Sequence, residues 1–205
     1  AAGDRAVALG AQGQALGFFR DALEVTTEPA DRAALLERAG RAASAAAFHE
    51  EAERLLEEAI ELLRAAGDRS GAARVTGSLA DAMFGRYRLD AALALVESAA
   101  GEFADLGDDV GYASLLGQLA RFQMLRQVGF AAAVATADRA LAIAERLDRV
   151  DLVADVLVTR GVALTSMGRA YEGIGCLETG LHLAEKHGLL GTEIRARTNM
   201  SGPLM

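Results

Sequence analysis

The stretch AGRAASAAAFHEEAERLLEEAI, Ala39 to Ile60, indicates the fold of the chain, because small and large residues recur in it at helical spacing. The i, i+3, i+4, i+7 pattern of one helix face is formed by Leu36, Ala39, Gly40 and Ala43. After the segment AAAFH at 45–49, a second helical face follows with Ala52, Leu55, Leu56, Ala59 and Leu63. The stretch therefore predicts two helices joined by a short turn.

The same pattern recurs along the chain with a period of about 40 residues, which is typical of stacked repeats. Small residues recur at three places: first Gly40, Ala80, Ala120 and Gly161, then Ala52, Ala92, Ala133 and Gly173, and finally Ala59, Ala99, Ala140 and Gly180. We expect them where two helices cross closely. The large residues expected to fill the space between hairpins are Leu36, Leu56, Phe84, Phe103, Phe122 and Leu177.

Short polar turns such as AAGDRSG at 65–71 predict the limits of the repeat units, because Gly ends helices and Asp or Ser starts them. We expect one array with a partial unit at 1–29, units at about 30–67, 68–107, 108–148 and 149–188, and a partial unit at 189–205. No stretch of useful length alternates with period two, so no strand is expected. Partial units at both ends predict a fragment of a longer chain with uncapped ends.

The 205-residue chain carries a net charge of −8. Nucleic-acid binding needs a basic surface, so we expect none from this fragment. Cys176 is the only cysteine, which leaves no internal disulfide and favours a cytoplasmic protein. No run approaches the roughly 18 apolar residues of a membrane span, and the segment 1–10 lacks the pattern of a signal peptide.

The pattern resembles the tetratricopeptide repeat (TPR), which has a small residue in its first helix and two alanines on its second. The glycine or aromatic turn of that family corresponds to Phe48, to Gly85 with Tyr87, to Gly129 with Phe130, and to Gly168 with Tyr171. The resemblance implies an all-α fold, a right-handed α-solenoid of stacked helix hairpins.

The sequence departs from the TPR pattern in its longer period, against the usual 34 or so residues, and in lacking proline at the unit ends. The fourth unit also has glycines where alanines are usual. Longer units of this kind look like the arrays that follow an ATPase domain in large ATP-dependent regulators and cyclases of high-GC bacteria.

The sequence offers no constellation for catalysis. His182 and His187 are five residues apart and do not share a helix face, and HEEAE at 49–53 lacks the second histidine of a zinc-protease motif. The glycine-rich GIGCLETG at 173–180 falls within a predicted helix, whereas a dinucleotide site follows a strand. Cys176 is expected to be a small hydrophobe on a packed helix. We therefore expect no enzyme, no cofactor and no metal site.

In the TPR family the first helices line a concave surface that holds peptides. By helical phase, the concave-face residues of this chain are predicted to be Arg38, Arg41, Arg74, Asp81, Phe84, Gln118, Arg121, Met124, Thr159, Arg195 and Asn199. Arg41, Asp81 and Arg121 occupy equivalent places and should lie in line. Arginines on an acidic chain favour an acidic or carboxylate-ended partner segment. The alternative is a solvated face whose charges are satisfied by their neighbours.

Three functions remain open from the sequence. The first is a non-catalytic scaffold that binds a protein segment, or docks a domain of its own parent chain, through the concave face. The second is a small-molecule sensor of a signalling ATPase, cyclase or transcriptional regulator, with its ligand near Phe84, Arg121 and Met124. The third is self-association into a homo-oligomer through the uncapped ends.

Overall fold

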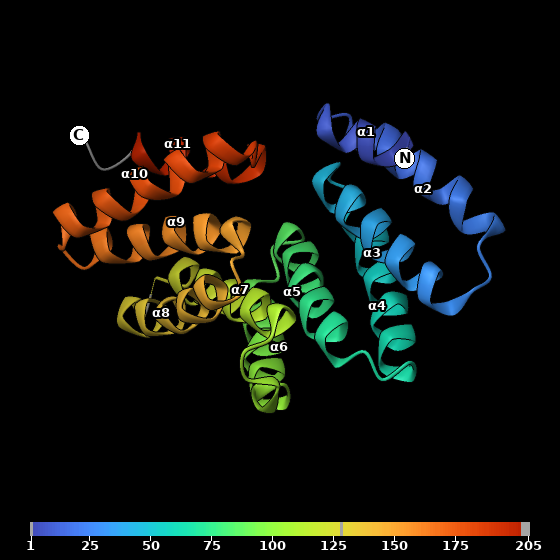
Figure 1. The fold of residues 1–205 in the computed structure, drawn as a ribbon, viewed down its shortest axis with the longest axis horizontal. Helices are drawn as coiled ribbons and strands as arrows, with labels where there is room; N and C mark the ends of the chain where they lie inside the picture. The colour runs from blue at the N-terminus through green and yellow to red at the C-terminus, as the bar shows by residue number, and fades with distance from the viewer. Residues whose placement is uncertain (1, 128, 202–205) are drawn as a thin grey trace. The chain divides into compact units, whose positions relative to one another are not determined.

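The computed structural model describes residues 2–127 and 129–201, which form eleven α-helices, one 3₁₀ helix and no strand (Figure 1). The α-helices are α1 (Ala2–Ala8), α2 (Gln12–Val25), α3 (Pro29–Ala45), α4 (His49–Ala65), α5 (Arg69–Gly85), α6 (Leu89–Glu102), α7 (Val110–Leu125), α8 (Phe130–Arg146), α9 (Val150–Ser166), α10 (Ala170–His187) and α11 (Leu190–Met200). The 3₁₀ helix η1 is Ala104–Leu106. The predicted all-α fold of helix hairpins is confirmed.

The chain divides into two compact units, the N-terminal unit of residues 1–99 and the C-terminal unit of residues 100–205. In the N-terminal unit α3 packs against α4, and this pair lies between α2 and α5. Its core includes the fully buried Leu36, Leu56 and Val75. In the C-terminal unit α7 packs on α8, and α9 packs on both α8 and α10. No helix of the described residues is long and apolar enough to cross a membrane.

The residues at the three recurring small places are all buried, as predicted. A Cβ atom at Gly40 would lie only 2.5 Å from Cγ of Leu56 on the facing helix. At the crossing of α9 and α10, a Cβ atom at Gly161 would lie 2.8 Å from the carbonyl oxygen of Gly173. Small side chains at these places therefore let the two helices of a hairpin approach closely.

Of the large residues predicted for the core, five are at most 1% exposed: Leu36, Leu56, Phe103, Phe122 and Leu177. Phe84 is only partly buried, so the prediction of a core position is wrong for this residue. It is the penultimate residue of α5.

The helix boundaries follow local chemistry. Asp68 and Asp109 accept hydrogen bonds from the backbone N–H groups of Gly71, at 2.8 Å, and Tyr112, at 3.0 Å, and so cap α5 and α7. Inside the hairpins, the chain reverses through a residue with positive φ, as at Tyr87 (61°) and Gly168 (80°). Glycine reaches this conformation without steric cost, whereas the tyrosine adopts it at some cost.

Candidate functional site

The predicted concave-face residues are divided between the two units. The N-terminal unit holds Arg38, Arg41, Arg74, Asp81 and Phe84, and the C-terminal unit holds Gln118, Arg121, Met124, Thr159, Arg195 and Asn199. The predicted line of Arg41, Asp81 and Arg121 spans both units and remains a prediction. Within each unit the structure shows what these side chains contact.

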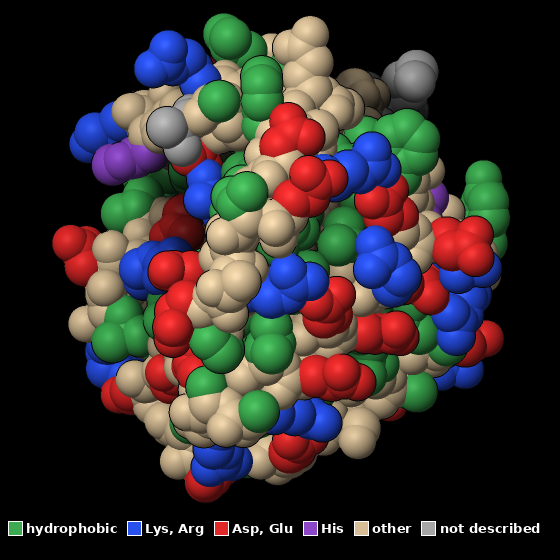
Figure 2. All heavy atoms as spheres, turned by 90° about the vertical axis from the view of Figure 1, so that its right-hand side faces the viewer, with side chains coloured by type: hydrophobic (Ala, Val, Ile, Leu, Met, Phe, Trp, Pro, Cys, Tyr) green, Lys and Arg blue, Asp and Glu red, His purple; other side chains and the backbone are tan. Residues whose placement is uncertain are grey.

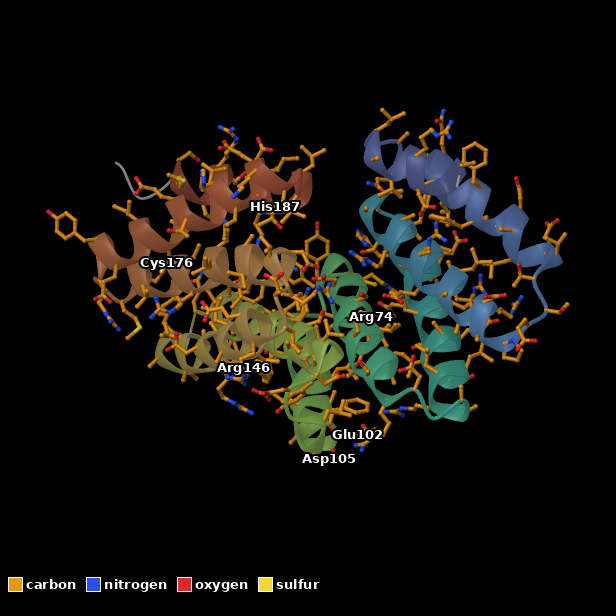
Figure 3. The ribbon with its side chains drawn as sticks, in the orientation of Figure 1. Arg74, Glu102, Asp105, Arg146, Cys176 and His187 are labelled. Carbon is orange, nitrogen blue, oxygen red and sulfur yellow. The ribbon has the colours of Figure 1, made fainter. Side chains whose placement is uncertain are left out.

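Two predicted arginines of the N-terminal unit are held by acidic residues of the preceding first helix. Arg38 on α3 forms an ion pair with Asp4 on α1, and its guanidinium lies 4.7 Å from the ring centroid of Phe19. Arg74 on α5 (Figure 3) donates to Oε2 of Glu37 on α3 at 2.8 Å. Glu37 is only 8% exposed, so the positive charge of Arg74 compensates a largely buried carboxylate.

The C-terminal unit repeats this arrangement. Arg195 on α11 forms an ion pair of 2.9 Å with Oδ1 of Asp155 on α9 and donates to Oγ1 of Thr159 at 3.0 Å. Thr159 is 1% exposed, so the prediction that it lies on an exposed face is wrong. Asn199, one turn further along α11, donates to the backbone carbonyl of Arg195 at 2.8 Å.

These contacts have one feature in common: an arginine of one first helix bonds an acid of the first helix before it in the array. The sequence separations are 34 residues for Arg38, 37 for Arg74 and 40 for Arg195. Asp4, Glu37 and Asp155 were not identified from the sequence. The available signal was an acid close to one repeat period upstream of each arginine. These three arginines are therefore engaged within the array.

Arg41 differs from the other arginines predicted on the concave face of the N-terminal unit. It is exposed on α3, and no described residue forms a hydrogen bond or an ion pair with its guanidinium. A free guanidinium offers five N–H donors in a planar fork that fits a carboxylate. Arg41 is thus available to an anionic partner without loss of an internal contact.

The remaining concave-face residues are partly buried. Asp81 and Phe84 lie near the end of α5, and Arg121 lies 5.9 Å from the ring centroid of Phe122. The side-chain oxygen Oε1 of Gln118 is buried and has no hydrogen-bond partner among the described residues. Met124 packs against a core cluster that includes Val134 and Leu164, so its side chain contributes to the hairpin interior.

A second feature, which sequence reasoning missed, is an open cleft of about 750 Å³ in the N-terminal unit. Residues 47–51 and Arg54 line it from the start of α4, and Arg86 lines it from the end of α5. We name it the turn cleft, because it lies at the turn between α3 and α4. None of the predicted concave-face residues lines it.

The imidazole of His49 forms one wall of the turn cleft and rests on Gly85. A Cβ atom at Gly85 would lie 2.3 Å from Cε1 of His49, so the ring keeps this position only because residue 85 has no side chain. Atom Nδ1 of His49 is buried and has no hydrogen-bond partner among the described residues. Phe48, also in the wall, is 53% exposed.

Among the described residues, the remaining charged and potentially reactive side chains offer no further site. On the face of the N-terminal unit in Figure 2, acidic and basic side chains are interspersed. In the C-terminal unit the hydrogen bond from Arg146 (Figure 3) lowers the pKa of Asp108 below its usual value. Arg160 donates to Sγ of Cys176 at 3.0 Å, and Cys176 packs against a small apolar cluster as expected. In residues 2–127 and 129–201, no group of three or more His, Cys, Asp and Glu could hold a metal ion.

No protein-family model and no curated protein matches the sequence. Solved structures share the fold. The Rap conjugation gene regulator of plasmid pLS20, in complex with the Phr* peptide, is 17% identical with a TM-score of 0.80. The match covers 96% of this chain and 55% of the regulator, so the chain spans about half of its length.

Two further solved structures show the same fold. TTC0263, a thermophilic TPR protein of Thermus thermophilus, is 23% identical with a TM-score of 0.66, and the match covers 97% of this chain and 95% of that one. PlcR of Bacillus thuringiensis, in complex with the peptide PapR7 and DNA, is 12% identical with a TM-score of 0.70, covering 96% and 72%. The chain therefore has a TPR-like solenoid fold.

Proposed function

We propose that this chain is a non-catalytic protein-interaction module that binds a segment of a partner protein on the face of its first helices. The observation that carries the proposal is the contrast among the arginines of that face. Arg38, Arg74 and Arg195 are engaged by acids of the array, whereas Arg41 is exposed and unengaged by any described residue. A surface that uses its other arginines internally leaves this one for a partner.

The fold favours this proposal. Stacked hairpins present an extended and fixed surface, on which a partner segment can bind without reorganising the protein. Two proteins with this fold, the Rap regulator and PlcR, are solved in complex with peptides. The partner segment could belong to another protein or to a longer parent chain that includes a regulatory ATPase or cyclase.

The chemistry of Arg41 gives the finer part of the proposal. A guanidinium binds a carboxylate through two parallel hydrogen bonds, and Arg41 exposes such a group on a chain of net charge −8. We therefore propose an acidic or carboxylate-ended partner segment. The sensor hypothesis has less support, since the side chain of Met124 packs against a hairpin core.

The experiment is affinity capture from a lysate of the source organism with the wild-type chain, an Arg41→Glu variant and an Arg64→Glu control. Arg64 is also exposed, but it lies in the last turn of α4. We expect Arg41→Glu to lower capture of a specific partner by about tenfold or more, because a carboxylate there repels an acidic segment. The control should capture the partner normally, and circular dichroism should show equal helicity.

Capture that is equal for the wild type and Arg41→Glu would contradict the role of Arg41. A thermal shift caused by a small metabolite, with no protein captured, would instead favour the sensor. A mass above that of the monomer, with no partner captured, would favour self-association.

A further inference from the structure

The turn cleft has a charge pattern that does not balance within the protein. Of its acidic wall residues, Glu51 is occupied by Arg20 of α2, whose Nε donates to Oε1 at 2.8 Å. Beside the cleft, Glu53 accepts with a single oxygen from both Arg86, at 3.2 Å, and Arg88, at 3.1 Å. One carboxylate thus serves two guanidinium groups, and one positive charge remains.

Arg54 adds a second unbalanced charge. Its nearest acidic oxygen is on Glu58, at 3.9 Å, which is too long for a hydrogen bond. Glu58 already accepts from Arg32, from Nη2 at 2.7 Å and from Nε at 3.0 Å. The side chain of Arg54 is 66% exposed, so its N–H donors are accessible from solvent.

Among the described residues that line the cleft, Glu50 supplies the one unpaired negative charge that opposes these two. Glu50 lines the cleft, and no described cation is paired with it. Two arginine charges are unbalanced and Glu50 contributes one negative charge, so the cleft has a net charge of about +1. The total charge of the chain is −8. A monoanion matches this balance, whereas a phosphate dianion would meet the Glu50 carboxylate with an extra charge.

The walls add an apolar component. Phe48 exposes part of its ring beside the arginines, and Ala47 continues the apolar surface. The ring of His49 is held on Gly85, which keeps it in the wall. A group that combines a carboxylate with an apolar or aromatic part would place each part against matching chemistry.

We infer that the turn cleft is a second binding site, which takes a carboxylate joined to an apolar group, with Arg54 and Arg86 as its donors and Phe48 as its apolar wall. The ligand is either a free aryl or alkyl carboxylic acid or the carboxylate end of a peptide with an apolar last residue. The site is separate from the concave face, so its test is independent of the proposed function.

The test follows the Nε–Hε resonances of the arginines by NMR in the full chain. The probes are 3-phenylpropionate, the peptide acetyl-Gly-Gly-Phe with a free carboxylate, the same peptide with a C-terminal amide, and inorganic phosphate. We expect either carboxylate probe to shift Arg54 and Arg86, with a dissociation constant on the order of 1 mM. Arg54→Gln should weaken this binding about fivefold, and Arg64→Gln should not change it.

A second variant tests the wall. Gly85→Ala forces the His49 ring to move. This change should alter the stability of the fold little, because the added Cβ atom meets a side chain and not the backbone. We expect the helicity of this variant to equal that of the wild type and its dissociation constants for the carboxylate probes to differ from those of the wild type. Arg41→Glu should bind the probes as the wild type does, which separates this site from the proposed function.

The comparison of the free-acid peptide with 3-phenylpropionate distinguishes the source of the ligand. Stronger binding of the free-acid peptide than of 3-phenylpropionate assigns the site to a peptide end, and the reverse order assigns it to a small acid. The inference is overturned if the amidated peptide or phosphate shifts the arginines as much as the carboxylates do. It is also overturned if no probe causes a shift up to about 10 mM, or if Arg64→Gln and Arg54→Gln have equal effects.

Discussion

The crossing of α9 and α10 provides the sharpest test of how small residues hold the hairpins together, through the change Gly173→Ala. A Cβ atom at this position would lie 2.2 Å from Oγ1 of Thr165, 2.7 Å from the carbonyl oxygen of Gly161 and 2.9 Å from the backbone nitrogen of Thr165. Two of these three atoms belong to the backbone of α9, so a side-chain rotation cannot relieve the overlap. The helices would have to separate.

The control is Gly175→Ala on the same helix. Gly175 is exposed, and nothing lies within 4 Å of a Cβ atom built there. Alanine has the higher helix propensity, so this change should stabilise the protein by about 0.5–1 kcal/mol. Gly173→Ala gains the same propensity but adds an overpacking cost of about 1–3 kcal/mol. The difference between the two variants isolates the packing cost.

The assay is urea denaturation followed by circular dichroism, with the transition midpoints of the two variants compared to that of the wild type. We expect Gly175→Ala to raise the midpoint and Gly173→Ala to leave it unchanged or lower it. Equal stabilisation by both changes would contradict this prediction, because it would mean that α9 and α10 do not need a glycine at their crossing.

Three other predictions concern charge and packing. Arg74→Ala leaves the largely buried carboxylate of Glu37 without its cation. We expect this change to lower the free energy of unfolding by about 1–3 kcal/mol, measured by urea denaturation. The double variant Arg74→Ala with Glu37→Leu should recover most of that loss, because it also removes the unpaired carboxylate. The hydrogen bond from Arg146 lowers the pKa of Asp108, so the pair stabilises the folded state above the usual Asp pKa. This stabilisation is lost as the pH falls through the pKa of Asp108 in the folded state. NMR titration should find that low pKa in the wild type and an ordinary one in Arg146→Gln. Phe122→Ala removes a fully buried ring and should cost about 3–5 kcal/mol in the same urea experiment.

The helices and the places of the small residues could be predicted from the sequence, because both depend on local spacing. Gly40 and Gly161 recur with the repeat period, and the structure puts each at a close helix crossing. Phe84 shows the limit of this reasoning. It is expected among the large residues that fill the space between hairpins, yet it is only partly buried at the penultimate position of α5.

The site was only partly predictable, since helical phase gives a direction but not a neighbour. Arg41 and Arg74 both point by phase to the same face, yet Arg41 is exposed and Arg74 is bonded to Glu37. Thr159 also has the phase of an exposed residue, but Arg195 from the next first helix covers it. Which arginine meets an acid depends on how far one hairpin is offset from the next.

The all-α class, the period and the pattern of small residues can be read from the amino-acid sequence, because they arise from contacts within a helix and between the two helices of one hairpin. Which charges are already satisfied, and where a cleft opens, depends on the tertiary structure. The pair of Arg74 with Glu37 joins side chains of different hairpins, and the turn cleft is lined by Arg54 and Arg86 from different hairpins. Such contacts follow from the angle and offset at which hairpins stack, and helical periodicity carries no information about either.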